Sequence, residues 1–372
     1  MEVLLESAWK HAPKNMGNKL HTMCSYMAMF PPSVPNYFIQ KYSNVDDTVL
    51  DPFSGRGTTV LEACMLDRIG IGNDKNPLAY SLTLSKVRVP QKGRIISRID
   101  KLERKFKPEK IDISKEHRNI RMIFGDYSLK QLVYLKKKLN WRRSNVDAFI
   151  TSMILGIMQG KTKGYLSLSM PNTFSMSPDY IRKFVAEHKL RRPKRDAFKL
   201  LRLKLERCYQ RPKTKGKAYN QDVRHMTKIK TESVDLIMTS PPYTRVISYG
   251  RYNWIRLWFL DKNFREVDKK LFVTQSILRY TTFMTDVLME FKRVTRPNGT
   301  IVLVIGDVKD RETDKIYNLA NIVWKNCAEP FGFEKIEEYE DIIRDDTKVS
   351  KIWGEKKGNA TKIDRIIVLK KI

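Results

Sequence analysis

The chain contains few cysteines, and they are not grouped. Cys24, Cys64, Cys208 and Cys327 are scattered over 372 residues, and none belongs to a CxxC pair. This spacing gives neither a disulfide framework nor a zinc site. All four are therefore interpreted as ordinary thiols of the core or surface, and no metal is expected.

Long apolar runs are also lacking. No stretch approaches the ~20 apolar residues of a membrane span. The start, MEVLLESAWKHAPKN, does not show the charged-then-apolar order of a secretion signal. With 41% hydrophobic residues, the composition fits a soluble globular protein. Because neither a span nor a secretion signal is indicated, we expect the protein to stay inside the cell and to have no membrane partner.

Acidic residues are scarce relative to basic ones. Lys and Arg total 71 against 41 Asp and Glu, which gives a formal net charge of +30. Residues 91–217 hold 34 of the cations and 11 of the acids, so this third of the chain carries most of the excess. A solvated basic surface without a partner is the simpler interpretation. The uneven distribution favours a nearly neutral catalytic part interrupted by a nucleic-acid-binding insertion.

Strand–turn–helix patterns occur on both sides of this basic segment. Before it, they cover 48–66 and 69–87. After it come a short strand in 218–226 that ends in Asp222, a strand at 233–243, a helix, turn and strand at 281–307, a helix at 316–333 and strands at 338–344 and 364–371. Helical patterns at 96–107, 129–143, 146–161, 178–190 and 195–210 fill the interval. The sequence thus predicts an α/β fold, a mostly parallel twisted sheet with helices on both faces, and a helical basic insertion. The expected parts are 1–90, 91–217 and 218–372.

Polar and glycine residues follow the first two predicted strands. In DPFSGRGTT (51–59), Gly55 and Gly57 allow a tight turn, and Thr58 and Thr59 are expected to cap the next helix. Asp74 in NDKNP follows the second strand. Its alternative role is that of an Asp-turn residue before a proline.

The strand at 233–243 ends in a rigid corner formed by Ser240, Pro241, Pro242 and Tyr243. Proline cannot donate to a sheet ladder, so the strand has to stop there. Taken alone, SPPY is most simply a strand-to-loop turn.

Taken together and in this order, these segments resemble the amino-group DNA methyltransferases, which use S-adenosylmethionine to methylate an exocyclic nitrogen. The resemblance covers nearly all of the chain outside 91–217. It is carried by FPPSVPNYFIQKYS (30–43), DPFSGRGTT, NDKNP, NQDVR (220–224), TSPPY (239–243), YGRYNWIRLWFL (249–260) and RPNGTIVLVIGD (296–307). It implies a Rossmann-like methyltransferase fold.

The resemblance also implies a set of cofactor-binding residues. Asp74 would hold the ribose hydroxyls, and Asp222 would meet the adenine amino group. Asp126 in FGDYSLK is a rival for the second role, and a helix N-cap is the structural alternative for Asp222. The expected S-adenosylmethionine site comprises Phe30, Pro31, Asp51, Phe53, Gly55, Gly57, Thr58, Asp74 and Asp222.

The corner suits the chemistry of an exocyclic amine. The lone pair of such an amine is delocalised into the base, and a duplex hides the atom, so the base has to be flipped into a pocket. Ser240 Oγ and the Pro241 carbonyl could accept the amine protons, and Tyr243 could stack on the base. No cysteine follows a proline at a strand end, which disfavours carbon-5 methylation.

The basic insertion is the expected reader of double-stranded DNA. The candidate phosphate-binding cations are Arg182, Lys183, Arg191, Arg192, Lys194 and Arg195. SLSMPNTFSMSPDY (167–180) is a candidate base-contacting loop or, alternatively, a structural loop. The helical spacing of Trp254 and Trp258 favours a core position over base stacking.

The leading hypothesis is a site-specific DNA methyltransferase that makes N4-methylcytosine, in the cytoplasm or nucleoid. In this family the serine of SPPY favours cytosine over the alternative, adenine N6. An RNA guanine-N2 methyltransferase and a non-catalytic basic nucleic-acid-binding protein are competing hypotheses. A restriction–modification role, with a cognate restriction endonuclease as partner, would suit such an enzyme. Neither the recognition sequence nor the oligomeric state follows from the sequence.

Overall fold

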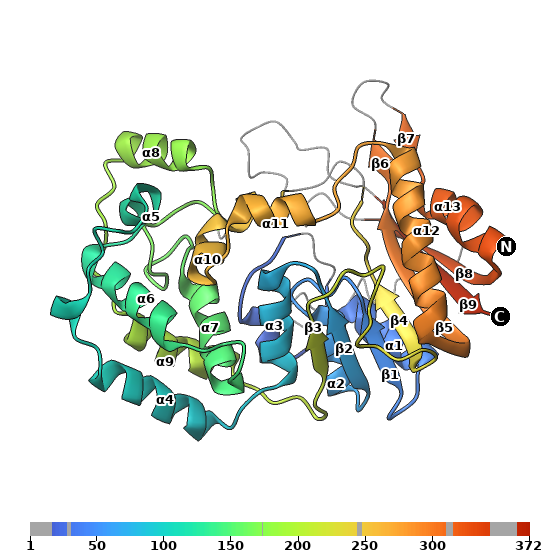
Figure 1. The fold of residues 1–372 in the computed structure, drawn as a ribbon, viewed down its shortest axis with the longest axis horizontal. Helices are drawn as coiled ribbons and strands as arrows, with labels where there is room; N and C mark the ends of the chain where they lie inside the picture. The colour runs from blue at the N-terminus through green and yellow to red at the C-terminus, as the bar shows by residue number, and fades with distance from the viewer. Residues whose placement is uncertain (1–16, 28–30, 173, 244–247, 310–314, 343–362) are drawn as a thin grey trace.

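The computed structural model describes residues 17–27, 31–172, 174–243, 248–309, 315–342 and 363–372. Figure 1 shows a sheet flanked by helices beside a lobe made only of helices. The strands are β1 (Thr48–Asp51), β2 (Ile69–Asn73), β3 (Lys217–Tyr219), β4 (Val234–Thr239), β5 (Thr295–Gly306), β6 (Val308–Lys309), β7 (Ile316–Tyr317), β8 (Phe333–Ile342) and β9 (Ile363–Lys371).

The helices fall into two groups along the chain. Those outside the interval between α3 and β3 are η1 (Lys19–Thr22), α1 (Ser33–Tyr42), α2 (Thr58–Met65), α3 (Pro77–Val87), η3 (Arg251–Asn253), α10 (Trp254–Phe259), α11 (Phe264–Lys270), α12 (Ile277–Val294), α13 (Leu319–Val323), the π-helix η4 (Trp324–Ala328) and η5 (Glu329–Phe331). Those between β2 and β3 beyond α3 are α4 (Lys92–Arg104), η2 (Pro108–Lys110), α5 (Arg118–Ile123), α6 (Asp126–Lys138), α7 (Asn145–Ile157), α8 (Pro178–Glu187) and α9 (Ala197–Cys208).

The main sheet has the order β3-β2-β1-β4-β5-β9-β8. The first five strands in this order are parallel, and β9 runs antiparallel to both of its neighbours. The strand order reverses between β1 and β4, and such a switch point opens a crevice beyond the carboxyl ends of the strands. This topology confirms the predicted Rossmann-like α/β fold.

Alternate residues of the central strands pack on opposite faces of the sheet. Leu50 and Ile237 join the cluster formed with α12 and α13. Val49 and Leu236 join the cluster formed with α1. The period of two along each strand therefore builds two separate apolar layers, which fix the register of the strand ends.

The helical lobe follows the predicted insertion, with some shifted boundaries. The helix expected at 178–190 ends at Glu187, and the strand expected at 218–226 is limited to Lys217–Tyr219. The helix expected at 316–333 changes from α to π and 3-10 geometry along its length. The lobe lies beside α3, and α10 and α11 cross between the lobe and the sheet (Figure 1).

Two absences hold for the described ranges. None of the helices found there is long and apolar enough to cross a bilayer. In the same part of the chain, His, Cys, Asp and Glu side chains form no cluster of three that could hold a metal ion. All four cysteines are free and buried.

Candidate active site at the strand switch point

The reversal of strand order brings the ends of β1 and β4 together. Thr239 Oγ1, at the last residue of β4, donates to Asp51 Oδ1, at the last residue of β1, over 2.6 Å. Burial raises the pKa of Asp51 to about 6, although hydrogen bonds to the carboxylate oppose the shift. This bond joins the start of the glycine turn to the start of the SPPY corner.

The glycine turn depends on its two glycines. Gly55 and Gly57 both have positive φ, at 50° and 77°. A Cβ on Gly57 would lie 2.8 Å from Thr83 Oγ1 of α3 and 3.0 Å from the Thr83 backbone. Any side chain at Gly57 would therefore push α3 away from the turn.

The capping prediction for this turn is wrong in detail. Gly57, in the left-handed conformation, is the N-cap residue of α2, and Thr58 is already the first residue of the helix. Thr58 Oγ1 accepts from Arg56 Nε instead, at 3.2 Å. The backbone geometry of a glycine thus replaces the expected side-chain cap.

Asp74 lies directly after β2 and faces the same turn. Its Oδ2 accepts from Gly55 N at 2.9 Å and its Oδ1 from Asn76 N at 2.8 Å. Burial raises its pKa to about 7, against the opposing effect of these two hydrogen bonds. The Asp74 carboxylate therefore stabilises its own turn, as the Asp-turn alternative expects, and also holds the glycine turn in place.

Two tyrosines that the sequence did not indicate lie next to Asp74. The Tyr26 hydroxyl accepts from Asn76 Nδ2 at 3.1 Å, and its ring stacks on Tyr249 with centroids 5.9 Å apart. An added Cβ on Gly55 would lie 3.6 Å from the Tyr26 ring. Tyr249 opens the 249–260 segment, which was compared with the family without a role for this residue, and Tyr26 lies in no such segment, so the folded structure is what brings the two rings together.

Asp222 lies in the loop beyond the end of β3 at Tyr219, and not at the strand end where it was expected. Asn220 Nδ2 donates to the Asp74 carbonyl at 2.7 Å, which joins this loop to the end of β2. The rival Asp126 is the first residue of α6 in the helical lobe, where it pairs with Arg192. The third-strand position therefore belongs to the segment that contains Asp222.

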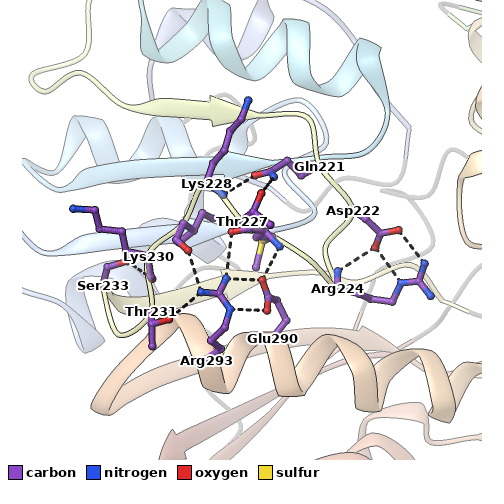
Figure 2. Close-up of polar contacts among 12 residues, drawn as sticks. Gln221, Asp222, Arg224, Thr227, Lys228, Lys230, Thr231, Ser233, Glu290 and Arg293 are labelled. Carbon is purple, nitrogen blue, oxygen red and sulfur yellow. Dashed lines mark hydrogen bonds and ion pairs between the residues drawn. The ribbon is translucent and has the colours of Figure 1, made fainter.

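The Asp222 carboxylate already has cationic partners, as Figure 2 shows for Arg224. Arg224 Nε lies 3.0 Å from Oδ1, while Arg224 Nη2 and Lys75 Nζ lie 2.9 and 2.7 Å from Oδ2. The hydrogen bond from Arg224, followed by that from Lys75, keeps the pKa of Asp222 well below its usual range. Both oxygens of the Asp222 carboxylate therefore already accept from cationic donors.

The SPPY corner leaves the sheet after β4 with its tyrosine turned back toward the protein. Tyr243 OH lies 3.1 Å from Ser240 Oγ and 3.4 Å from the Val304 carbonyl of β5. The ring packs against the cluster that α12 forms on the sheet, and burial raises its pKa well above the usual value. Ser240 and Tyr243, which were expected to contact a base, therefore contact each other in this structure.

The remaining predicted cofactor residues occupy less defined positions. Phe30 lies outside the described residues, and Pro31 is exposed shortly before α1. Phe53 is half-buried, with its ring 6.3 Å from that of Phe283 on α12. The geometry thus gathers Asp51, Gly55 and Asp74 with the corner, and leaves Pro31 without a defined role.

Of the two roles left open for 167–180, most of the described residues fit the structural loop and not the base-contacting loop. Ser167, Ser175 and Asn172 are buried, and Ser175 N donates to the Tyr252 carbonyl at 2.7 Å. Trp254 is buried and donates from its indole to the Met176 carbonyl. The described part of 167–176 is therefore a core segment between the lobe and α10, and the core prediction for Trp254 is confirmed.

The six predicted DNA-binding cations do not behave alike. Arg195 donates to the carbonyls of Tyr165 and Ser167, so it stabilises a loop, and burial lowers its pKa. Arg182 pairs with Asp179 of the same helix. The other four are exposed side chains: Lys183, Arg191, Arg192 and Lys194.

Fold and site together define a doubly wound α/β protein with a glycine turn and two carboxylates of raised pKa at its switch point. The family model described as DNA methylase (N6_N4_Mtase) matches residues 2–84 of the chain. This range contains the glycine turn and Asp74. Over these residues the chain is similar to amino-group DNA methylases, and the family model groups N4 and N6 enzymes together.

Two curated relatives come from Methanocaldococcus jannaschii. The type II methyltransferase M.MjaI is 40% identical over 65 residues, which are 18% of this chain and 22% of that protein. The type II methyltransferase M.MjaII is 33% identical over 64 residues, or 17% of this chain and 12% of that protein. The chain therefore matches less than a quarter of the length of either relative.

Among solved structures, TrmN from Thermus thermophilus aligns with 95% of this chain and 52% of its own. The TM-score is 0.39 and the identity is 11%. The putative DNA modification methylase TTHA0409 from the same organism, complexed with S-adenosyl-L-methionine, is 20% identical over 40% of this chain and 51% of its own, with a TM-score of 0.26.

Proposed function

We propose that this chain transfers a methyl group from S-adenosylmethionine to the exocyclic N4 of a flipped cytosine in double-stranded DNA. The observation that carries the proposal is the bond between Thr239 and Asp51. It brings the glycine turn and the SPPY corner to one point, at the strand reversal where ligands bind in open α/β sheets. The DNA methylase match over residues 2–84 supports the same reaction class.

The described residues fit S-adenosylmethionine. Asp74 is a partly buried carboxylate whose described hydrogen-bond donors are backbone amides, so it can accept further donors such as ribose hydroxyls. Beside it, Gly55 leaves room between its backbone and the Tyr26 ring that a side chain would fill. When bound, S-adenosylmethionine supplies an electrophilic methyl group on a sulfonium centre.

The corner would act on the amine of the base. Ser240 Oγ, released from Tyr243, and the Pro241 carbonyl can accept hydrogen bonds from the two N–H groups of the amine and so favour a geometry in which its lone pair is less conjugated with the base. The two prolines fix the backbone, so these acceptors need little reorganisation. Tyr243 would have to rotate away from Val304 to stack on the base, so this rotation would both open the corner and supply the stacking surface.

Two further features support DNA and cytosine as the substrate. The formal charge of +30 suits a polyanion. The serine in the first position of the corner favours N4-cytosine, where an acidic or amide residue would favour adenine. The relatives are named type II methyltransferases, and this makes a cognate restriction endonuclease a partner worth seeking.

The test is a product assay with corner variants. DNA incubated with enzyme and S-adenosylmethionine is digested to nucleosides and examined by mass spectrometry. Wild type should yield N4-methylcytosine. Ser240→Ala should lower the rate, and Tyr243→Ala should lower it further through loss of a stacking surface worth ~1–3 kcal/mol. Cofactor affinity should stay unchanged in both.

Ser97→Ala provides a matched control, because Ser97 is an exposed serine of α4. N6-methyladenine as the product would assign adenine, in place of cytosine, as the target base. Methylguanosine formed in RNA would assign RNA, in place of DNA, as the substrate. Full activity in the Ser240→Ala, Tyr243→Ala double variant would show that the corner is only a turn.

A further inference from the structure

A surface groove of about 810 Å³ lies in the helical lobe, between α5, the start of α6 and the segment that joins α8 to α9. Its charged lining consists of Arg118, Arg121, Arg191, Arg192 and Lys194, with Asp126 as the single acid. Five cations against one carboxylate leave four uncompensated positive charges around one depression. The two arginines of α5 were not singled out by the sequence.

Three of these arginines are exposed and unpaired. Across the described ranges, the guanidinium groups of Arg118, Arg121 and Arg191 contact neither a carboxylate nor a hydrogen-bond acceptor. Arg192, by contrast, donates to Asp126 Oδ1 at 2.8 Å and to the Arg121 carbonyl at 3.0 Å. Repulsion between the unpaired cations is unfavourable in the free protein and would be relieved by an anion.

The groove is held open by fixed backbone. A Cβ on Gly125 would lie 2.2 Å from the Pro193 carbonyl, so the 191–194 segment lies directly against the start of α6. Just beyond it, Arg195 N donates to Ser128 Oγ at 3.0 Å, and Ser128 Oγ donates to the Arg195 carbonyl at 2.6 Å. The basic side chains therefore project from an anchored segment.

From this geometry we propose that the groove binds the phosphate backbone of duplex DNA, with Arg118, Arg121 and Arg191 as direct phosphate contacts. Arginine forks suit phosphate oxygens, and several cations around a single groove suit a row of phosphates better than one small anion. Lys194 lies 5.4 Å from the Tyr127 ring centroid, which holds another cation at the rim. The inference rests on the proposed DNA substrate and assigns the surface that binds it.

The experiment measures binding of a fluorescently labelled DNA duplex by anisotropy, from 50 to 200 mM salt. The test variant is Arg118→Gln, Arg121→Gln, Arg191→Gln. Each phosphate contact adds ~0.9 to the slope of log K against log salt, so three lost contacts should reduce the slope by about 2.7. Affinity at 100 mM salt should fall roughly 100-fold.

The matched control removes three exposed cations from another side of the same lobe. Arg94, Lys101 and Lys105 lie on or next to α4, at the edge of the lobe away from α5 and α8 in Figure 1. Arg94→Gln, Lys101→Gln, Lys105→Gln changes the net charge equally and should keep the wild-type slope. Cofactor affinity by calorimetry and circular dichroism should match wild type in both variants.

The outcomes separate the groove from the function. If wild type methylates DNA and the test variant keeps the wild-type slope, or if both variants lose affinity equally, the groove is not the DNA site. If wild type prefers duplex RNA of the same sequence and the test variant loses that binding, the DNA assignment is overturned. If wild type binds neither duplex, the proposed function itself fails.

Discussion

The Asp74 carboxylate contacts two segments of the chain, because one oxygen accepts from Gly55 N and the other from Asn76 N. Its pKa is raised to about 7 by burial, and that of Asp51 to about 6. Near neutral pH both acids are therefore partly protonated in the free protein. An ionised carboxylate accepts hydrogen bonds from hydroxyl groups more strongly than a protonated one does.

Cofactor affinity should therefore depend on pH through Asp74. Below pH 7 the Asp74 carboxyl is mostly protonated, and in that form it accepts hydrogen bonds from ribose hydroxyls less strongly. Above pH 7 it is ionised, so affinity for S-adenosylmethionine should rise from pH 6 to pH 8 and then level off. Asp74→Asn should weaken binding at pH 8 by ~1–3 kcal/mol and flatten the profile. Calorimetry at several pH values measures both effects.

Glu109→Gln, an exposed acid of η2, is the control and should keep the wild-type profile. A profile that stays as steep in Asp74→Asn would assign the titration to another group, such as Asp51. Unchanged affinity at pH 8 would remove Asp74 from the cofactor site.

At the scale of elements, the loop between β3 and β4 is held against α12 by hydrogen bonds to Glu290 and Arg293, two α12 residues that also pair with each other (Figure 2). Glu290 Oε1 accepts from Met226 N at 2.6 Å and from Arg293 Nη2 at 2.7 Å. Arg293 also donates to the Ile229 carbonyl at 3.1 Å. The loop that contains Asp222 is thus positioned by α12, which packs on one face of the sheet.

Arg293→Met should loosen this loop without touching the corner. It leaves the buried Glu290 without its cation, so the free energy of unfolding should fall by about 1–3 kcal/mol, less than for a fully buried pair because Arg293 is partly exposed. Cofactor affinity should fall as well, while the rate at saturating cofactor should change little. Denaturant titration and steady-state kinetics separate these effects.

The control is Arg279→Met, since Arg279 is exposed near the start of the same helix. It should leave both stability and affinity unchanged. Loss of stability in Arg293→Met with cofactor affinity intact would show that the loop does not position the cofactor.

Much of this element arrangement follows from the sequence. Apolar strands followed by glycine or acidic turns indicated β1, β2 and β4, and parallel strands necessarily gather Asp51, Asp74 and Ser240 at one edge. The inward turn of Tyr243 and the cations around Asp222 depend on side chains from distant elements. The groove could not be predicted for the same reason, since Arg118 and Arg191 come together only when α5 and the 191–194 segment pack.

At the scale of the whole molecule, the basic insertion is not a separate body. One apolar cluster joins Leu78 and Leu82 of α3 to Phe149 of α7 and Trp254 of α10. Ser85 Oγ of α3 lies 2.7 Å from Ser152 Oγ of α7. The predicted parts 1–90, 91–217 and 218–372 follow one another along the chain, but a single apolar core includes residues from all three.

The backbone contact between the lobe and the N-terminal segment is equally close. A Cβ on Gly156 of α7 would lie 1.9 Å from the Met23 carbonyl, so α7 packs directly on the chain that leads to Tyr26. Arg256 of α10, which is buried, donates to the Ser25 carbonyl at 3.0 Å and to the Leu155 carbonyl at 3.1 Å. A disturbance in the lobe should therefore reach the cofactor side of the sheet.

Phe149→Ala tests this coupling. Phe149 is fully buried on α7, and loss of its ring should lower the free energy of unfolding by ~3–5 kcal/mol. Because the core is shared, calorimetry should show one transition at a lower temperature, and amide exchange should speed up in α3 and β2 as well as in the lobe. Leu203→Ala, at a side chain 49% exposed on α9, should change little. Two transitions in Phe149→Ala, with that of the sheet unmoved, would mean that the helical lobe folds as an independent domain.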